Sequence, residues 1–274
     1  YDTNQNLAAM RRDLGNNGQL IFVTNDSNET TPVTFHLDSS LTTAYVLDAQ
    51  TGEIYEVPVV NGTVQGEVTA KGSIVLIGAS SEVFTKADLS EGNPIAPDEP
   101  VATTNLDQWT LTVTGQDVNG TYTATGEQAL TNWRDNPTLK YNADPGVYTT
   151  TFNLDKVDPT QDYILQLGTL YGVPEISVNG SEAIAVPMAP YQLDISQYLK
   201  PGENTISIQL VVGIRNRLIK YGLEGEDGNG QNQQAYLQFA SATPVKLGMV
   251  EPAQLIQIQT DRVVDDTSSG STSE

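Results

Sequence analysis

The chain of 274 residues contains no cysteine, and this absence excludes several kinds of chemistry. Disulfides, thiolate metal sites and cysteine nucleophiles all need that residue. Histidine is nearly absent too, since His36 is the single one, and a Ser-His-Asp triad would have to use it. His36 alternates with Phe35 and Leu37 in an expected strand, and no nucleophile-elbow pattern accompanies it. We therefore expect His36 to be an ordinary strand residue that faces solvent.

Basic residues are scarce: 13 Lys and Arg stand against 34 Asp and Glu, which gives a formal net charge of −21. Such a field repels phosphate backbones and anionic lipid headgroups, so we expect neither nucleic acid nor a membrane as a partner. A neutral ligand such as a glycan is compatible with this charge. The alternative is that the acidic residues simply keep a secreted protein soluble. No stretch approaches the roughly 20 apolar residues that a membrane-spanning helix needs.

The chain is rich in short segments where apolar and polar residues alternate, which is typical of half-buried antiparallel strands. In its second half these runs are 147–154, 163–167, 173–178 and 205–211, and further strands are expected at 235–239, 245–247 and 253–259. Asn179-Gly180 supplies a pair that tolerates positive φ in a tight hairpin. The pattern predicts a β-sandwich.

A second set of strand patterns comes earlier, separated by turns rich in Gly, Asn and Asp. These candidates are 19–24, 32–37, 44–47, 53–59, 63–69 and 73–77. They predict a small sandwich over residues 1–85. Before them, only Leu7 to Met10 has helical spacing, and that run is too short to form a helix alone.

The two halves are joined by residues 86–105, which contain three prolines among acidic and small residues and show no periodicity. This composition predicts a semi-rigid linker, followed by the second sandwich over 106–262. Residues 263–274 are Ser, Thr, Gly and acidic residues that cannot pack, so a disordered tail is expected there. The chain begins with Tyr1 rather than Met, and we expect a processed chain or an excised piece.

The order of motifs in the second half carries a resemblance to a known family. The motifs are Gly146-Val147-Tyr148, Gln166-Leu167-Gly168, Ile176-Ser177-Val178-Asn179-Gly180, Pro190-Tyr191-Gln192-Leu193-Asp194-Ile195, Leu199-Lys200-Pro201-Gly202-Glu203-Asn204 and Asn216-Arg217-Leu218. Together they resemble the galactose-binding-like jelly roll of glycoside hydrolases. The likeness is greatest to the C-terminal sandwich of the large α-L-rhamnosidases, and the pattern is also similar to the sugar-binding domain of β-galactosidase and β-glucuronidase relatives.

The first half looks like the short β-domain that follows the catalytic barrel in several glycosidases. The motifs are Leu20-Ile21-Phe22-Val23-Thr24-Asn25, Leu47-Asp48-Ala49-Gln50-Thr51-Gly52-Glu53 and Lys71-Gly72-Ser73-Ile74-Val75-Leu76. The resemblance implies an all-β chain of two sandwich domains, the second a jelly roll, with the barrel upstream of Tyr1. Its implied role is that of a non-catalytic accessory region that supports this barrel and contacts carbohydrate.

Two other functions stay open. One is a self-standing carbohydrate-binding or surface-adhesion module, and the other is a small hydrolase that uses its own carboxylates. Hydrolysis of a glycoside needs two carboxyl groups at a set separation, and no pair stands out, so no catalytic residue is assigned. Richness in Thr, Asn, Ser and Gly with little Lys favours an extracellular, bacterial protein.

Aromatic side chains are the candidates for sugar binding, because they pack on the apolar C–H patches of a pyranose ring. We single out Trp133, Tyr171 and Tyr191. Trp133 lies in an expected irregular loop, 126–145, and Tyr171 lies in another expected loop. Packing beneath the loop is the alternative for both residues.

Two further groups of residues are candidates for structural roles. The resemblance places Asp194 at a strand and Asn216 and Arg217 beyond another, which implies a clamp in which Arg217 bridges two edges. Asp194 would either pair with Arg217 or accept hydrogen bonds from a turn. Glu226, Asp227 and Asn229 form an oxygen-rich loop that could hold Ca²⁺, yet they lack a complete calcium-loop spacing, so a solvated loop is the alternative and no cofactor is expected.

Overall fold

The computed structural model describes residues 6–15, 18–27, 29–49, 51–95 and 100–259. The chain forms two compact units, Tyr1–Glu99 and Pro100–Glu274. The fold is all-β and sandwich-like, as predicted, with antiparallel pairing between neighbouring strands. Among the described residues, no helix is both long and apolar enough to cross a membrane. The tail expected at 263–274 lies outside the described residues.

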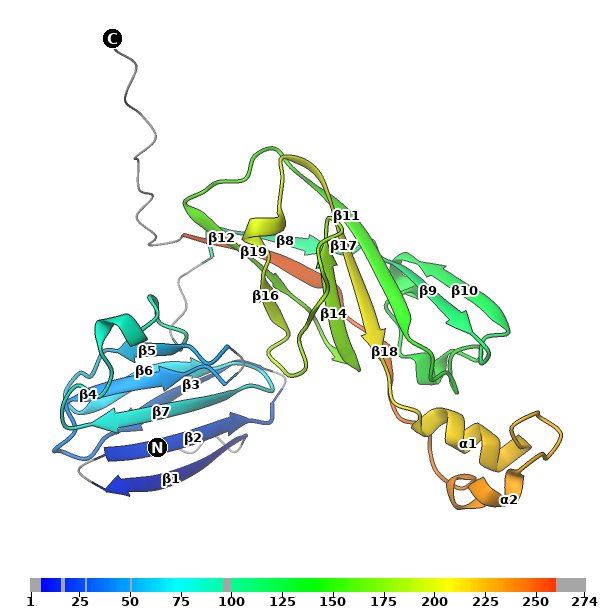
Figure 1. Cartoon of the computed structure of the whole chain (residues 1–274), viewed down its shortest axis with the longest axis horizontal. Coiled ribbons are helices and arrows are strands. Elements are labelled where there is room, and N and C mark those ends of the chain that lie inside the picture. The colour runs from blue at the N-terminus through cyan, green and yellow to red at the C-terminus, as the bar shows by residue number, and fades with distance from the viewer. Residues whose placement is uncertain (1–5, 16–17, 28, 50, 96–99, 260–274) are drawn as a thin grey trace, which may run out of the picture. The chain divides into compact units, whose positions relative to one another are not determined.

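The first unit packs a five-stranded sheet, β1-β2-β7-β4-β5, with a two-stranded sheet, β3-β6 (Figure 1). Its strands are β1 (Leu7–Gly15), β2 (Gly18–Asn25), β3 (Thr31–His36), β4 (Thr43–Leu47), β5 (Ile54–Val57), β6 (Thr63–Val68) and β7 (Ser73–Ala79). Buried side chains from both sheets form one core, among them Val23, Phe35, Val46, Val64 and Leu76. The six expected strands are all present, and His36 is an exposed strand residue.

β1 is a strand that the sequence did not predict. It pairs with β2 from Leu7 opposite Asn25 to Gly15 opposite Gly18, and most of its side chains are exposed. Hydrogen bonds to the neighbouring strand hold it, so its side chains need no period of two. This explains why its pattern resembled a short piece of helix.

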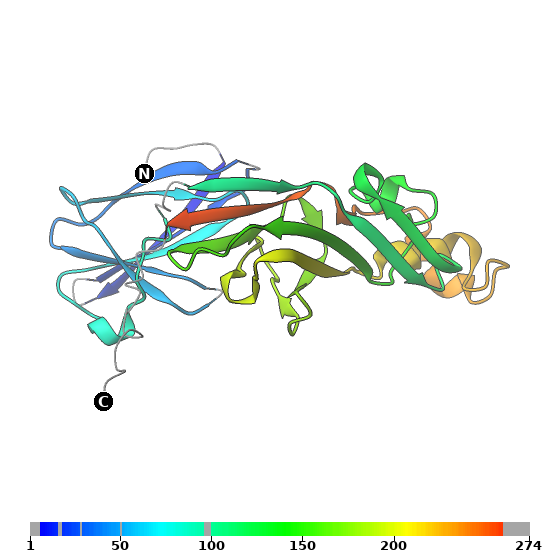
Figure 2. The same cartoon turned by 90° about the horizontal axis from the view of Figure 1, so that it is seen from above.

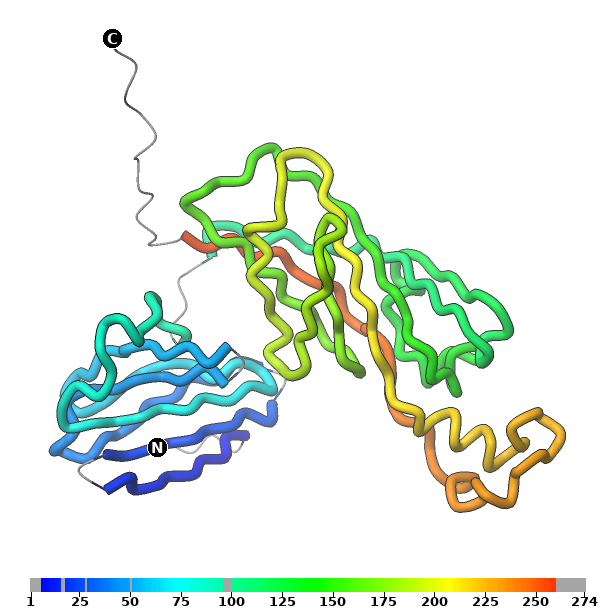
Figure 3. The backbone as a smooth tube through the Cα atoms, in the orientation of Figure 1, coloured from blue at the N-terminus to red at the C-terminus, as the bar shows by residue number. Residues whose placement is uncertain are grey.

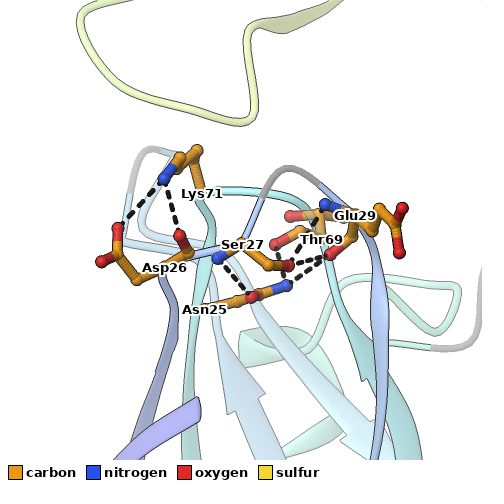
Figure 4. A network of polar contacts seen from close by, with 6 residues as sticks. All are labelled: Asn25, Asp26, Ser27, Glu29, Thr69 and Lys71. Carbon is orange, nitrogen blue, oxygen red and sulfur yellow. Dashed lines mark hydrogen bonds and ion pairs between the residues drawn. The ribbon is translucent and has the colours of Figure 1, made fainter. Parts of the chain in front are cut away.

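A network of polar contacts closes one end of the first unit around Asn25 (Figure 4). The Asn25 side chain is 2% exposed. Its Nδ2 donates to the carbonyl oxygens of Glu29, at 2.8 Å, and Val68, at 3.0 Å, and its Oδ1 accepts from the Ser27 N–H at 2.9 Å. The amide thereby joins the loop after β2 to the end of β6. Nearby, Lys71 forms an ion pair with the exposed Asp26.

Replacing Asn25 with alanine is expected to destabilise the first unit by about 1–3 kcal/mol, because buried carbonyl oxygens lose their donor. Both tryptophans, Trp109 and Trp133, belong to the second unit. In a urea titration, the unfolding transition of the first unit, followed by far-UV circular dichroism, should therefore move to a lower urea concentration. The transition followed by tryptophan fluorescence, which reports the second unit, should stay where it is. Asp26→Ala, which removes a surface ion pair, is the control with a loss of about 0–1 kcal/mol. Equal losses in the two variants would contradict the role assigned to Asn25.

The second unit is a sandwich of two antiparallel sheets. The six-stranded sheet has the order β10-β9-β11-β17-β14-β15 and the four-stranded sheet has the order β16-β12-β19-β8, with a small β13-β18 pair beside them. The strands are β8 (Ala102–Leu106), β9 (Thr110–Gly115), β10 (Gly120–Thr125), β11 (Gly146–Leu154), β12 (Gln161–Gln166), β13 (Leu170–Tyr171), β14 (Val173–Val178), β15 (Ile184–Ala185), β16 (Gln192–Asp194), β17 (Gly202–Val211), β18 (Gly248–Met249) and β19 (Ala253–Gln259).

The inner faces of these two sheets supply the core of the second unit. Its members include Leu111, Val113, Tyr148, Tyr163, Leu165, Ile206, Ile208 and Leu255. They alternate along the strands with residues that face outward, as the period-two pattern predicted. The Asn179-Gly180 hairpin is confirmed, since both residues have positive φ, 53° and 81°, and the chain turns from β14 toward β15 there.

The expected linker is shorter than predicted. A short 3₁₀ turn, η1 (Lys86–Asp88), follows the first unit's strands, and Ile95 lies in that unit's core with 1% exposure. At the other end, β8 pairs with β19 from Ala102 onward and belongs to the second sandwich. The sequence did not predict these contacts, because prolines interrupt strand and helix patterns. A single apolar side chain such as Ile95 can still pack into a core between them.

A helical excursion, residues 215–245, interrupts the strands between β17 and β18. It contains α1 (Arg215–Glu224), α2 (Gln233–Tyr236) and the turn η5 (Leu237–Phe239), and it extends beyond the sheets of its unit in two views (Figures 1 and 2). Figure 3 follows the backbone out of β17 and back to β18. The strand expected at 235–239 is therefore wrong, because a short apolar run does not distinguish a strand from a helix. The strand expected at 245–247 is wrong as well, since those residues have no regular secondary structure.

Candidate functional site

Arg217, on the first turn of α1, makes the most buried ion pairs in the described part of the chain. Its Nε donates to Asp117 Oδ2 and its Nη2 donates to Asp144 Oδ1, each at 2.7 Å. The side chains of Arg217 and Asp117 are 15% and 5% exposed. Burial alone would lower the pKa of the guanidinium, but the hydrogen bonds to the two carboxylates outweigh it and raise that pKa. Arg217 thus clamps two loops onto α1.

The expected pairing of Arg217 with Asp194 is wrong. Asp194 ends β16, and its Oδ1 accepts hydrogen bonds from the backbone N–H of Ser196, at 2.9 Å, and from its hydroxyl. The Ser196 hydroxyl in turn accepts from the Tyr163 N–H at 2.8 Å. Asp194 therefore closes a turn at the edge of the four-stranded sheet, which is the other role that the sequence left open.

Asn216 sits beside the clamp and is fully buried. Its Nδ2 donates to the carbonyl oxygens of Lys140 and Val245, at 3.0 Å each, and its Oδ1 accepts from the Val245 N–H at 2.8 Å. Three segments far apart in the sequence therefore meet at one side chain. Asn216 and Arg217 together hold the base of the helical excursion against the sandwich.

Trp133 is a core residue, so the expectation that it binds sugar is wrong. Its ring is fully buried, and its Nε1 donates to the Tyr148 hydroxyl at 2.9 Å. Gly146 and Gly248 cover it closely, since a Cβ on either would lie 2.6 or 2.5 Å from ring atoms. Burial raises the pKa of the Tyr148 hydroxyl to about 12. Trp133 instead packs beneath its loop, which was the alternative that the sequence left open.

Tyr171 and Tyr191 are both half-buried, so neither exposes its whole ring to a ligand. The Lys246 ammonium lies 5.3 Å from the centroid of the Tyr171 ring and 3.2 Å from its hydroxyl. Tyr191 packs against the core of the second unit, and its carbonyl accepts from the Leu167 N–H at 2.9 Å. Tyr171 therefore keeps some access to solvent beside a cation, and Tyr191 belongs chiefly to the sandwich.

The loop at Glu226, Asp227 and Asn229 is held by its own hydrogen bonds. Asp227 Oδ1 accepts from the N–H groups of Asn229, at 2.8 Å, and Gln231, at 3.1 Å. The two oxygens of Glu226 accept from the Tyr236 hydroxyl, at 2.6 Å, and from Asn232, at 2.9 Å. Among the described residues, no group of three or more His, Asp or Glu side chains could hold a metal ion. The arrangement is that of a self-capped, solvated loop.

The outer face of the four-stranded sheet carries a row of carboxamide side chains that the sequence did not reveal. Gln166 is opposite Gln192 and Gln254, and Gln254 is opposite Asn105, so the four side chains share one face of the sheet. The strands that carry them, β16, β12, β19 and β8, are labelled in Figure 1. Gln192 Nε2 donates to Gln166 Oε1 at 3.0 Å, and Gln254 Nε2 donates to Asn105 Oδ1 at 2.9 Å. We call these four residues the carboxamide row.

An open pocket of about 380 Å³ adjoins the carboxamide row. Its lining consists of Asn105, Gln166, Leu167, Gly168, Glu251, Pro252 and Gln254. Glu251 Oε2 accepts a hydrogen bond from the Thr169 N–H at 2.9 Å. Hydrogen bonding from Thr169 lowers the pKa of the Glu251 carboxyl, which keeps this group ionised at the pocket wall. The pocket thus combines three carboxamides with one oriented carboxylate.

Comparison with known proteins identifies the fold. No family model and no curated protein matches the chain. Among solved structures, the rhamnosidase from Novosphingobium sp. PP1Y matches 92% of this chain at 18% identity with a TM-score of 0.60. The chain has a glycoside hydrolase-related β fold. It spans 25% of the length of that rhamnosidase.

Two other solved glycoside hydrolases match with low TM-scores. The β-glucuronidase of an uncultured Clostridium sp. matches 60% of the chain at 13% identity, with a TM-score of 0.39, over 30% of its own length. The β-porphyranase of family 86 from Bacteroides plebeius matches 95% at 12% identity, with a TM-score of 0.27, over 37% of its own length.

Two groups of polar side chains in the second unit differ in what they leave open to a ligand. Asp117 and Asp144 are two carboxylates brought to one point, but Arg217 holds both of them, and neither lines the pocket beside the carboxamide row. The carboxamide row, by contrast, faces solvent and can both donate and accept hydrogen bonds.

Proposed function

We propose that the chain is a non-catalytic accessory region of a larger, secreted bacterial glycoside hydrolase that resembles the α-L-rhamnosidases. The observation that supports this proposal is the extent of the likeness to the rhamnosidase, which includes 92% of this chain but 25% of the other. Neither unit alone makes up that much of the chain, so parts of both units are matched. In this proposal a catalytic domain elsewhere in the same polypeptide is the partner of the two sandwiches.

The second unit would be a galactose-binding-like jelly roll within that architecture. Its two facing antiparallel sheets and the motif order described above support this assignment. Its role would be to buttress the catalytic domain and to contact carbohydrate. A self-standing carbohydrate-binding module is the second candidate, and the carboxamide row with its pocket favours it, since such a surface can act without a catalytic domain.

The accessory role predicts that the chain by itself hydrolyses no glycoside. The test is incubation of the purified chain with aryl α-L-rhamnosides and a panel of other aryl glycosides, followed by release of the aryl alcohol. We expect no turnover above a heat-denatured sample. Turnover that Asp117→Asn, Asp144→Asn or Glu251→Gln abolishes would overturn the proposal, because it would place a catalytic carboxyl in this chain.

A further inference from the structure

The outer face of the four-stranded sheet differs from that of the six-stranded sheet. Across the six-stranded sheet, outward positions in one row are hydroxyl residues, namely Thr125, Thr110, Thr149, Ser207 and Ser177. Threonine is a common residue of exposed strands, so strand propensity alone accounts for much of that row. Asparagine is depleted in strands, and glutamine is not among the residues enriched there. The carboxamide row therefore needs a reason other than propensity.

The hydrogen bonds within the carboxamide row leave part of its capacity unused. A carboxamide has two N–H donors and an oxygen that accepts twice. The two pairs, Gln192 with Gln166 and Gln254 with Asn105, use one donor and one acceptor each. The row crosses four strands, so it is roughly 14 Å long at the usual strand spacing. The two hydrogen bonds within the carboxamide row fix the orientation of its side chains, so its remaining donors and acceptors are held in place.

Beside the carboxamide row lies an apolar pair, with Asp194 of β16 and Thr103 of β8 at its two ends. Ile164 and Ile256 are opposite each other on β12 and β19, point to the same outer face and are only partly buried. A pyranose ring has the same combination of surfaces, since its hydroxyls donate and accept at the edge and its C–H groups form apolar patches. The face matches an uncharged, hydroxyl-rich ligand longer than a single sugar.

We propose that this face, formed by the carboxamide row, Ile164, Ile256 and the pocket at Glu251, binds a neutral glycan. The proposal rests on the carbohydrate-contacting role proposed above and gives that role a location. Uncharged carboxamides recognise hydroxyls without requiring a charged ligand, while the net charge of −21 and the Glu251 carboxylate disfavour uronic acids and sulfated sugars. In this proposal the pocket binds one sugar unit of the glycan, and the carboxamide row binds the neighbouring sugar units.

The test is native affinity electrophoresis of the chain in gels that contain a soluble neutral β-glucan, galactomannan or arabinoxylan, with polygalacturonate as the anionic comparison. We expect retardation in at least one neutral gel and none with polygalacturonate. The double variant Gln166→Ala with Gln254→Ala should weaken binding about tenfold or more, since each lost hydrogen bond costs affinity. The matched control is Gln209→Ala, an exposed glutamine on the outer face of β17, which should leave binding unchanged.

Three results would overturn the inference. They are no retardation in any neutral gel, binding of equal strength to polygalacturonate, and binding that the double variant preserves while Tyr171→Ala abolishes it. Circular dichroism of each variant shows whether the sandwich is intact, and the single variant Gln254→Ala replaces the double variant if that protein unfolds. A chain that binds no glycan and hydrolyses none contradicts this inference alone, whereas turnover of an aryl glycoside contradicts the accessory role.

Discussion

Replacing Arg217 with alanine is expected to lower the free energy of unfolding of the second unit by about 3–5 kcal/mol. The reason is that Asp117 and Asp144 remain in place as largely buried carboxylates without a counterion. Arg217→Lys should recover part of the loss, because an ammonium supplies charge without the two directed N–H groups that reach both acids. Urea unfolding followed by tryptophan fluorescence measures the effect, since both tryptophans lie in this unit.

The matched control for this prediction is Arg215→Ala. Arg215 precedes Arg217 by two residues in α1 and is exposed, so its loss should cost about 0–1 kcal/mol. A triple variant, Arg217→Met with Asp117→Asn and Asp144→Asn, should be more stable than Arg217→Ala, because it removes the buried charges together. If Arg217→Ala and Arg215→Ala unfold at the same urea concentration, the clamp contributes nothing and our account of it is wrong.

Trp133→Ala is expected to destabilise the second unit by about 3–5 kcal/mol, because it leaves a cavity beneath two glycines in contact with the ring. Trp133→Phe should cost less, about 1–3 kcal/mol, since the ring volume is partly kept. The Tyr148 hydroxyl then loses one donor and keeps the Met249 N–H at 3.0 Å. The fluorescence of Trp109, the remaining tryptophan, reports the unfolding of both variants.

Leu237→Ala is the control for the tryptophan variants, because Leu237 is a large apolar side chain that is 46% exposed. It should cost well under half of the loss in Trp133→Ala. Glycan binding gives a second readout. If Trp133→Phe kept its stability but lost retardation in a neutral-glycan gel, Trp133 would belong to a ligand site after all.

The strands of this protein were predictable because their signal is local. Alternation of apolar and polar residues follows from burial of one face, and a pair such as Asn179-Gly180 marks a turn by its own conformational freedom. These features require no knowledge of which segments meet. β1 escaped prediction because pairing with β2 holds it, and both of its faces are largely exposed.

The candidate site was not predictable because its residues come together only through the fold. Asp117 and Asp144 are 100 and 73 positions from Arg217, and nothing local distinguishes them among 34 acidic residues. Trp133 lies in a loop without periodicity, and its burial depends on Gly248, far along the chain. The glutamines of the carboxamide row stand at outward positions of their own strands, but their adjacency depends on the register between strands.

The way in which Asn216 bonds to Val245 bears on how this protein can change over evolution. The helical excursion leaves the sandwich and returns to it at nearly the same point, since the two residues share hydrogen bonds of 2.8 and 3.0 Å. The cost of closing a surface loop rises only slowly with its length. Segments can therefore be inserted into or deleted from the far end of this excursion while the register of every strand is preserved, which makes it a natural place for relatives to diverge.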